Sequence, residues 1–246
     1  MKNIAIITGA SSGIGREFVK TLKDHMNVEE VWVIARSEDK LRALQEETPI
    51  PVRPVPLDLS DPAFIGKMES LLATEKPDVR LLINASGYGK FDAVEKLSME
   101  DDLGMIDLNC RALAAMTKLA LPYMHSGAKV IEIASVAAFQ PIPYINVYGA
   151  SKAFVLSFSR ALNRELKKRG IHVMALCPFW TKTASLTVQC GKMKTLSSRN
   201  MSRCTTRPSS WTAPGRRFPA EKTTSFRDSR PKRRSPWSSS CPTASL

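Results

Sequence analysis

A tyrosine and a lysine four residues apart carry the residue types for proton transfer. Tyr148 and Lys152 stand near the start of a helical pattern, so both side chains leave one helix face about one turn apart. A free tyrosine, with a pKa of about 10, is a poor acid or base at neutral pH. A lysine charge at about 4 Å favours the phenolate by roughly 4 kcal/mol at an effective dielectric near 20. That energy lowers the tyrosine pKa by up to about three units, so the pair predicts acid/base chemistry.

A serine precedes this pair at the end of an apolar run. Residues 129–134 have the pattern of a buried strand, which places Ser135 at the strand's C-terminal end. A hydroxyl at that position could hold a substrate oxygen while Tyr148 transfers its proton. The same spacing also fits a helix start whose tyrosine packs against a loop and whose lysine is solvated. Spacing alone leaves both interpretations open.

A glycine loop between a strand and a helix points to phosphate binding. The apolar residues 4–7 predict a buried strand, T-G-A-S-S-G-I-G follows at 8–15, and a helical stretch continues to Met26. Glycines let the backbone turn tightly and approach a pyrophosphate, which then rests against the helix amides. The spacing is G-x-x-x-G-x-G and differs from the G-x-G-x-x-G fingerprint. The order of strand, loop and helix therefore predicts a nucleotide site.

The residue after the second predicted strand bears on the choice of cofactor. That strand, 30–35, ends at Arg36, which lies 21 residues after Gly15. Near this place an acidic residue accepts from the ribose 2′-hydroxyl of NAD, whereas an arginine suits the 2′-phosphate of NADP. Arg36 therefore favours NADP(H) over NAD(H). A surface arginine in a loop is the alternative.

The rest of the chain to residue 177 alternates strands with helices. The predicted helices are 37–47, 62–75, 100–124 and 147–169, and the further strands are 52–57, 79–83 and 171–177. Prolines at positions 54 and 56 cannot donate to a ladder, so 52–57 is expected at the sheet edge. Gly170 is expected to cap the last helix. The alternation predicts an α/β fold with a doubly wound parallel sheet covered on both faces.

Charge and cysteine content restrict the class of protein. The chain of 246 residues is long enough for one domain, and its net charge of +13 is unevenly spread. Residues 1–190 hold 23 Lys+Arg against 21 Asp+Glu, while residues 191–246 hold 13 against 2. The five cysteines form no C-x-x-C pair, so we expect neither a metal site nor a disulfide framework, and a cytoplasmic location. No apolar segment reaches the length of a membrane span.

Residues 1–183 resemble the short-chain dehydrogenase/reductase family. The shared motifs are T-G-A-S-S-G-I-G at the front, N-A-S-G after the fourth strand and S-x12-Y-x3-K after the fifth. The resemblance implies a three-layer Rossmann fold with strand order 3-2-1-4-5-6. It also implies hydride transfer between nicotinamide and a carbonyl or alcohol carbon of a small organic substrate. Members tend to form homodimers or homotetramers.

The resemblance further implies roles for individual residues. Ser135 would position the substrate oxygen, Tyr148 would be the acid/base, and Lys152 would bind the nicotinamide ribose and lower the tyrosine pKa. Asn109 would hold a water that links Lys152 to solvent. The implied cofactor contacts are the pyrophosphate loop, the adenine and ribose neighbours, the basic NADP position, and threonines near the carboxamide or phosphates: Gly9, Ser11, Gly13, Ile14, Gly15, Asp58, Asn84, Arg36, Thr181 and Thr183.

Two positions depart from the family pattern. N-A-S-G at 84–87 replaces the usual N-N-A-G, which removes one amide that would tie the centre of the sheet together. Pro178 is followed by Phe179 where the family has glycine, so the backbone is less free beside the nicotinamide. Neither change removes a catalytic group.

The composition changes after residue 190. Residues 191–246 contain no valine or isoleucine, two leucines, and 25 Ser, Thr or Pro among 56 residues. Such a segment buries too little apolar surface to offset its ordering entropy, so we expect a domain over 1–190 and a disordered basic tail. The family would place a substrate-covering helix pair, a final helix and a seventh strand here, so that strand is expected to be missing. A shifted reading frame near codon 190 is our hypothesis, which translation of the other two frames would test.

Two further interpretations remain open beside an NADP(H)-dependent oxidoreductase. One is a truncated protein that binds the cofactor without turnover. The other is a nucleic-acid-binding protein that uses the 13 basic residues of 191–246. That segment has no recognisable nucleic-acid motif, so nucleic acid is not an expected partner.

Overall fold

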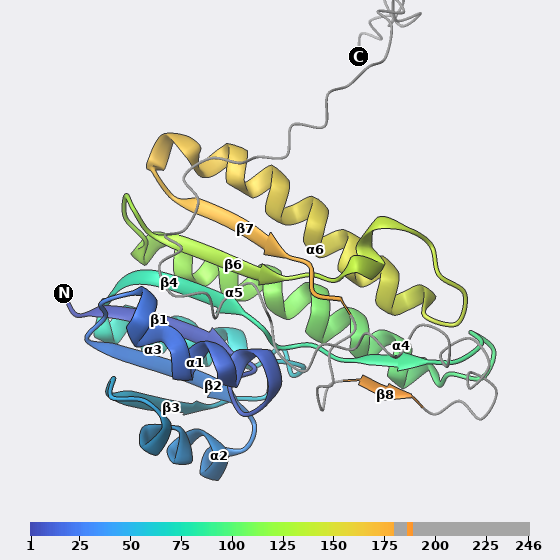
Figure 1. The fold of residues 1–246 in the computed structure, drawn as a ribbon, viewed down its shortest axis with the longest axis horizontal. Coiled ribbons are helices and arrows are strands. Elements are labelled where there is room, and N and C mark those ends of the chain that lie inside the picture. Colours follow the sequence, from blue (N-terminus) through green and yellow to red (C-terminus); the bar gives the residue numbers. More distant parts are fainter. Residues whose placement is uncertain (180–185, 189–246) are drawn as a thin grey trace, which may run out of the picture. The chain divides into compact units, whose positions relative to one another are not determined.

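The main sheet has six parallel strands (Figure 1). The computed structural model describes residues 1–179 and 186–188. The strands of this sheet are β1 (Asn3–Thr8), β2 (Glu30–Ala35), β3 (Val52–Pro56), β4 (Asp78–Asn84), β6 (Lys129–Ile133) and β7 (His172–Leu176). Their order is β3-β2-β1-β4-β6-β7. The predicted order 3-2-1-4-5-6 is confirmed once the strands of the main sheet alone are counted.

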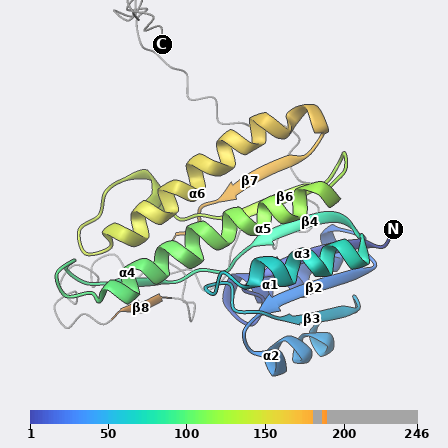
Figure 2. The same ribbon diagram turned by 180° about the vertical axis from the view of Figure 1, so that it is seen from behind.

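Helices cover both faces of the sheet. The helices and single turns are α1 (Gly13–His25), α2 (Glu38–Arg42), η1 (Ala43–Glu47), α3 (Phe64–Glu75), α4 (Met99–Ile106), η2 (Asp107–Ala112), α5 (Leu113–Ala120), η3 (Leu121–Tyr123), η4 (Val136–Phe139), α6 (Asn146–Glu165) and η5 (Leu166–Arg169). Figure 2 shows α3, α5 and α6 side by side in front of the sheet, and Figure 1 shows α1 on the opposite face. The predicted doubly wound parallel architecture is therefore confirmed.

Among the described residues, no helix is both long and apolar enough to cross a membrane.

Local sequence signals place several ends of these elements correctly. β3, with its two prolines, lies at the edge of the main sheet and pairs with β2 alone. Gly170 ends the turn after α6 with a φ of 68°, a left-handed conformation that favours glycine. An added Cβ there would lie 2.4 Å from the Ser126 hydroxyl oxygen, which also leaves no room for a larger residue.

Two parts of the fold differ from the prediction. The expected helix 100–124 is divided into α4, the π-helical turn η2 and α5, and it ends in the turn η3 at Tyr123. A short second sheet of β5 (Gly89–Phe91) and β8 (Leu186–Val188) was not predicted, because three-residue strands carry no clear alternation. The predicted tail 191–246 and the fate of a seventh strand lie outside the described residues.

The main apolar core lies between the sheet and the layer of α3, α5 and α6. Alternate residues of the central strands, among them Ile4, Ile6, Leu82 and Val130, pack against the buried faces of these helices. The mainly apolar sequences of these strands follow from burial on both faces of a parallel sheet. This rigid platform holds the carboxyl ends of the strands in fixed positions.

We predict that Met68→Ala destabilises the fold by about 2–5 kcal/mol, the usual cost of truncating a buried methionine. The Met68 side chain is fully buried on α3. The neighbouring Glu69 is exposed, so Glu69→Ala is the matched control and should change stability little. Urea unfolding followed by circular dichroism measures both. Equal unfolding free energies for the two variants would contradict the packing described here.

Candidate active site

The glycine loop joins β1 to α1 at the carboxyl edge of the sheet. Gly9 has a φ of 66°, and an added Cβ would lie 2.7 Å from the backbone of Ala85 at the end of β4. A Cβ on Gly15 would lie 2.4 Å from the Gly9 carbonyl oxygen. Gly13 also has a positive φ, of 55°. Only glycine allows this close approach between the loop, the helix start and β4.

The first turn of α1 leaves its amide groups available for an anion. Ser12 is the N-cap residue, and its side chain makes no capping hydrogen bond. The first N–H groups of a helix lack intrahelical partners, and the helix dipole favours negative charge there. Ser11, Ser12 and Ile14 line the adjoining cavity together with Gly9. Gly13 and Gly15 do not line it; their part is to shape the turn.

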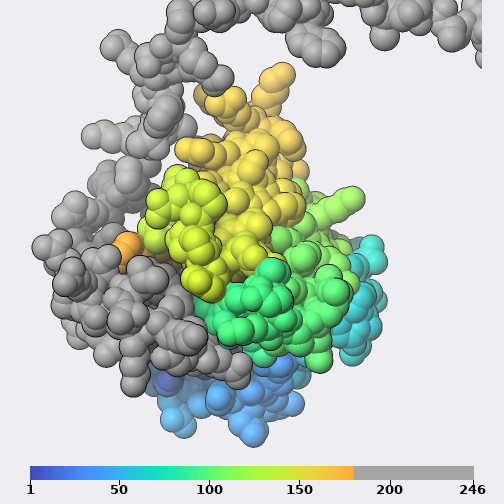
Figure 3. Space-filling model, turned by 90° about the vertical axis from the view of Figure 1, so that its right-hand side faces the viewer, coloured from blue at the N-terminus to red at the C-terminus, as the bar shows by residue number. Residues whose placement is uncertain are grey.

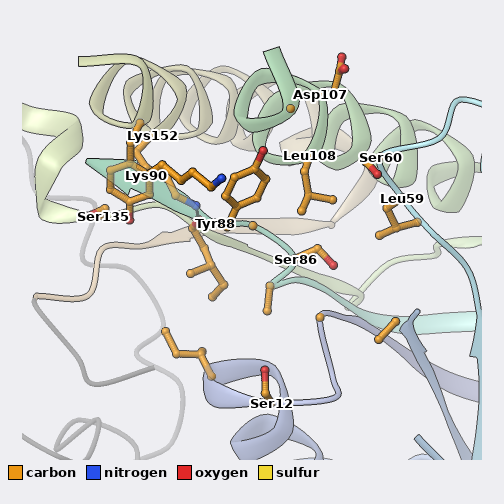
Figure 4. A pocket seen from close by; sticks show the side chains of 18 of the residues that line it. Ser12, Leu59, Ser60, Ser86, Tyr88, Lys90, Asp107, Leu108, Ser135 and Lys152 are labelled. Atoms are coloured by element: carbon orange, nitrogen blue, oxygen red, sulfur yellow. Dashed lines mark hydrogen bonds between the residues drawn. The ribbon is translucent and has the colours of Figure 1, made fainter. Parts of the chain in front are cut away.

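The cavity runs along the carboxyl edge of the sheet and has a volume of about 970 Å³. Pockets for small ligands and cofactors have volumes of about 300–1,000 Å³, so this one is large enough for a dinucleotide. Figure 4 shows Ser135 and Lys152 together at one end, Leu59 and Ser60 at the other, and Ser12 across from Ser86. Ligands of open α/β sheets bind at this edge, where the strand order reverses.

One end of the cavity carries positive charge beside a carboxylate. Arg36, directly after β2, and Lys40 on α2 both line it. Asp58 lies opposite and accepts hydrogen bonds from the Ser60 backbone N–H at 2.9 Å and from the Ser60 hydroxyl at 2.6 Å. Burial raises the pKa of Asp58, but these hydrogen bonds and the Arg36 charge outweigh it and lower the pKa overall. Asp58 is therefore ionised at neutral pH.

The Asn84 side chain is used inside the fold. It is buried and does not line the cavity. The amide nitrogen donates to Thr117 Oγ1 at 2.9 Å and to Glu132 Oε1 at 3.3 Å. The place of Asn84 beside the adenosine ribose stays a prediction, in which its backbone and not its side chain would face the cofactor. The neighbouring Ala85, Ser86 and Gly87 line the cavity instead.

Asn109 lies in the π-helical turn η2 and is fully buried. Its Oδ1 accepts from the Tyr88 N–H at 3.0 Å, and its Nδ2 donates to the Tyr88 carbonyl at 2.9 Å and to Ser151 Oγ at 3.0 Å. Ser151 Oγ in turn donates to the Tyr148 carbonyl at 2.7 Å. The side chain thus ties the loop after β4 to α6. Both of its N–H groups are in use, so the implied water would have to bind a carbonyl oxygen of this residue.

Ser135 and Tyr148 meet at the same end of the cavity. Ser135 follows β6, and its hydroxyl oxygen accepts from the Ala137 N–H at 3.2 Å. Figure 3 shows the yellow-green segment between β6 and α6 beside the green helix α4 on the surface. Burial raises the pKa of the Tyr148 phenol, while a hydrogen bond with Ser135 lowers it in part. Both residues line the cavity, as predicted from their motif.

Lys152 is buried beside them and points at the backbone of β6. Its ammonium donates to the Ile133 carbonyl at 2.8 Å and lies 5.7 Å from the centroid of the Tyr148 ring. Burial lowers the pKa of Lys152 to about 8. Burial raises the Tyr148 pKa overall, and the lowering of this pKa by Lys152 stays a prediction.

The sequence analysis missed three residues that fix the tyrosine and the lysine. The Phe91 ring packs edge-to-face on Tyr148, with centroids 5.6 Å apart. A Cβ on Gly89 would lie 2.8 Å from Tyr148 Cδ2, and one on Gly87 would lie 2.8 Å from Asn109 Oδ1 and 3.5 Å from Lys152 Nζ. The repeated glycines of S-G-Y-G-K were the available signal. Thr181 and Thr183 lie outside the described residues.

The parallel sheet, the glycine loop and the Ser-Tyr-Lys cluster define a Rossmann-type oxidoreductase. The sequence profile of the family described as short chain dehydrogenase matches residues 3–192. The chain therefore belongs to the short-chain dehydrogenase family.

Individual relatives agree with this assignment. The chain is 33% identical over 178 residues to an NADP-dependent 3-hydroxy acid dehydrogenase of Salmonella typhimurium, covering 71% of each chain. A short-chain dehydrogenase from Sphingobium yanoikuyae, solved in complex with NADPH, matches with a TM-score of 0.67 and 31% identity over 74% of this chain and 73% of that one. A 3-ketoacyl-(acyl-carrier-protein) reductase from Brucella melitensis, complexed with NADH, matches with a TM-score of 0.65 and 26% identity over 74% and 77%.

We predict that Gly9→Ala weakens both folding and the binding of a nicotinamide dinucleotide, for which NADPH serves as the probe. The left-handed backbone alone costs an alanine about 1–2 kcal/mol, and the clash with Ala85 adds to it. Gly66→Ala is the matched control, because a Cβ on Gly66 meets nothing within 4 Å and alanine favours the helix by about 1 kcal/mol. Thermal unfolding and NADPH fluorescence titration measure the two effects. A Gly9→Ala protein as stable as wild type would contradict the close approach to β4.

Proposed function

We propose that this protein transfers hydride between NADP(H) and a carbonyl or alcohol carbon of a small organic substrate, with Tyr148 as the acid/base. The observation that carries the proposal is the meeting of Ser135, Tyr148 and Lys152 at one end of a cavity of dinucleotide size. The other end holds Arg36 and Lys40, and the middle holds the amide-rich start of α1. These three regions match the nicotinamide, 2′-phosphate and pyrophosphate parts of one extended cofactor.

The chain's own residues would handle the substrate oxygen and its proton. Ser135 would donate a hydrogen bond to the substrate oxygen and fix its distance from Tyr148. In reduction, the neutral phenol of Tyr148 would give its proton to that oxygen, and in oxidation the phenolate would take it back. The bound cofactor supplies or accepts the hydride. Burial raises the pKa of Tyr148, which keeps the phenol protonated for the reducing direction at neutral pH.

Lys152 would act on this step through its charge. A fixed ammonium near the phenol stabilises the phenolate that forms when the proton leaves. The hydrogen bond to the Ile133 carbonyl holds the ammonium in place. A low-dielectric site strengthens this interaction relative to water.

The names of two relatives suggest which substrates to try first. The Salmonella protein is named for 3-hydroxy acids and the Brucella protein for a 3-ketoacyl thioester. We therefore propose a screen of 3-hydroxy acids with NADP⁺ and of 3-oxoacyl thioesters with NADPH, beside simple ketones. Failure of every substrate while NADPH still binds would favour a cofactor-binding protein without turnover.

We predict that Tyr148→Phe lowers turnover by at least about a hundredfold, the contribution typical of a general acid. NADPH affinity should stay within a few-fold of wild type, because the ring and its packing on Phe91 remain. Tyr123→Phe, which removes a hydroxyl from η3 outside the cavity, is the matched control. Steady-state rates and NADPH titration separate the two effects. A Tyr148→Phe protein with wild-type kcat would reject the acid/base role.

We predict that Arg36→Asp weakens NADPH binding far more than NADH binding, because an aspartate repels the 2′-phosphate and accepts from a 2′-hydroxyl. Arg42→Asp changes the net charge equally, and Arg42 does not line the cavity. The ratio of the two dissociation constants, measured for both variants at one ionic strength, is the readout. Equal losses for NADPH and NADH in Arg36→Asp would reject the 2′-phosphate role.

A further inference from the structure

A buried glutamate lies near the carboxyl end of β6, the strand between β4 and the edge strand β7. Glu132 is the fourth residue of β6 and is fully buried. It pairs in register with Asn84 of β4 and with Ala175 of β7. An acidic side chain in such a strand is costly unless it is neutral or has a counter-charge. Its presence therefore calls for one of these two explanations.

When Glu132 is ionised, the oxygen atoms around its carboxylate have too few donor protons for all of their short contacts. Thr117 Oγ1 lies 2.8 Å from the Leu113 carbonyl and 2.8 Å from Glu132 Oε1, but a hydroxyl has a single proton to donate. Among the described residues, Glu132 Oε2 and Asn84 Oδ1 have no hydrogen-bond partner. A proton on the carboxyl group supplies the missing donor. Thr117 can then accept from Glu132 and donate to Leu113.

The positive charge nearest to Glu132 belongs to Lys152 of α6, which is bound to the next residue of β6. The Lys152 ammonium donates to the carbonyl of Ile133, directly after Glu132. Among the described residues, the other titratable groups that act on this lysine are the thiols of Cys110 in η2 and Cys177 after β7. β4 contributes only the uncharged amide of Asn84. Glu132 is therefore the carboxylate that can balance the buried ammonium.

Proton affinities of the two groups agree with this pairing. Burial raises the pKa of Glu132 to about 7, although Thr117, Asn84 and the Lys152 charge oppose it. Burial lowers the pKa of Lys152 to about 8, and the Glu132 charge acts in the opposite direction. Glu132 therefore ionises within the range of pH where Lys152 still carries its proton.

We propose that Glu132 is a positioning residue that exchanges a proton with solvent and whose carboxylate form is the counter-charge that keeps Lys152 in its ammonium form. Its proton leaves to solvent water, and no other bond changes. The first half of this proposal concerns the carboxyl group alone. The second half rests on the proposed function, in which the Lys152 charge supports Tyr148.

The first experiment measures the carboxyl group without activity. Infrared difference spectra of the full chain, recorded between pH 5 and 9, should show a neutral carboxylic acid that disappears near neutrality and is absent from Glu132→Gln. Asn84→Leu removes the amide N–H that donates to the carboxylate and lowers the Glu132 pKa, so the transition should move to higher pH. This shift identifies the group even if Glu132→Gln does not fold. A spectrum without an acid that titrates near neutrality would overturn the proposal.

The second experiment measures the coupling to Lys152 through the pH dependence of kcat. Glu132→Gln keeps the volume and the donor of the neutral acid but never becomes charged. Wild type and variant should therefore have similar kcat at pH 6, where the side chain at position 132 is neutral in both proteins. Without a negative charge at position 132, the Lys152 pKa is lower in the variant than in wild type. Above neutrality, kcat of the variant should therefore lie below that of wild type, by up to about tenfold for each unit of pKa difference. The descending basic limb thus moves to lower pH.

A matched control separates this effect from general damage to the core. Ser159 is a buried residue of α6 whose hydroxyl donates to its own helix at Val155, so Ser159→Ala disturbs packing without changing charge. Its pH profile should keep the wild-type shape. A Glu132→Gln protein whose kcat is reduced by one factor at every pH would assign Glu132 a structural role and overturn the coupling. If wild type shows no turnover with any substrate, the proposed function fails while the infrared result still decides the state of Glu132.

Discussion

The ammonium group of Lys152 is almost inaccessible to water, so the groups around it have to compensate for its buried charge. Only 5% of this residue is exposed. The ammonium donates to the Ile133 carbonyl at 2.8 Å, and the proposed counter-charge is Glu132. Position 87 is restricted to glycine by Asn109, because a Cβ there would lie 2.8 Å from Asn109 Oδ1. Lys152 thus joins the helix α6 to the end of β6.

The register of the parallel strands brings these groups together. Thr8 pairs with Asn84, and Asn84 pairs with Glu132, so three strand ends stand level at one edge of the sheet. Thr8 Oγ1 accepts from the N–H groups of Ala85 and Ser86, both at 3.1 Å, which turns the chain after β4 toward the glycine loop. A slip of one residue would exchange the faces of the strand and carry Glu132 away from Lys152. The site therefore depends on pairing that is set in the core.

The sequence predicts the framework well because its signals are local. Apolar runs predict the strands, the two prolines of β3 predict its place at the edge, and the glycine loop predicts a phosphate site, all without knowledge of distant contacts. The strand order and the roles of Ser135, Tyr148 and Lys152 come from the family resemblance, and all three residues line one cavity in the structure. The sequence could not predict where a side chain points when its partners lie far along the chain. Asn84 follows a strand like a cavity residue, yet it turns inward because Thr117 and Glu132 offer acceptors there.

The same limit applies to electrostatics. Spacing on a helix places a lysine near a tyrosine, but it cannot state how much water either group loses. Desolvation raises the Tyr148 pKa in the structure, against the expectation from Coulomb attraction alone. Asn109 likewise gave no sign in the sequence that the helix widens into a π-turn around it, although such turns are frequent at functional sites. Both features depend on tertiary packing, which no window of sequence contains.

Burial of two ionisable groups in one core has a consequence for the net charge there. When Glu132 is neutral and Lys152 is protonated the pair carries +1, and when Glu132 is ionised and Lys152 has lost its proton the pair carries −1. Between the two transitions, at about pH 7 and about pH 8, both are ionised and the net charge is zero. Desolvation is least unfavourable for a neutral pair, because the attraction between its members offsets part of the cost of burial. The ammonium that the proposed reaction needs is therefore best tolerated by the fold in the same pH range in which Glu132 is able to balance it.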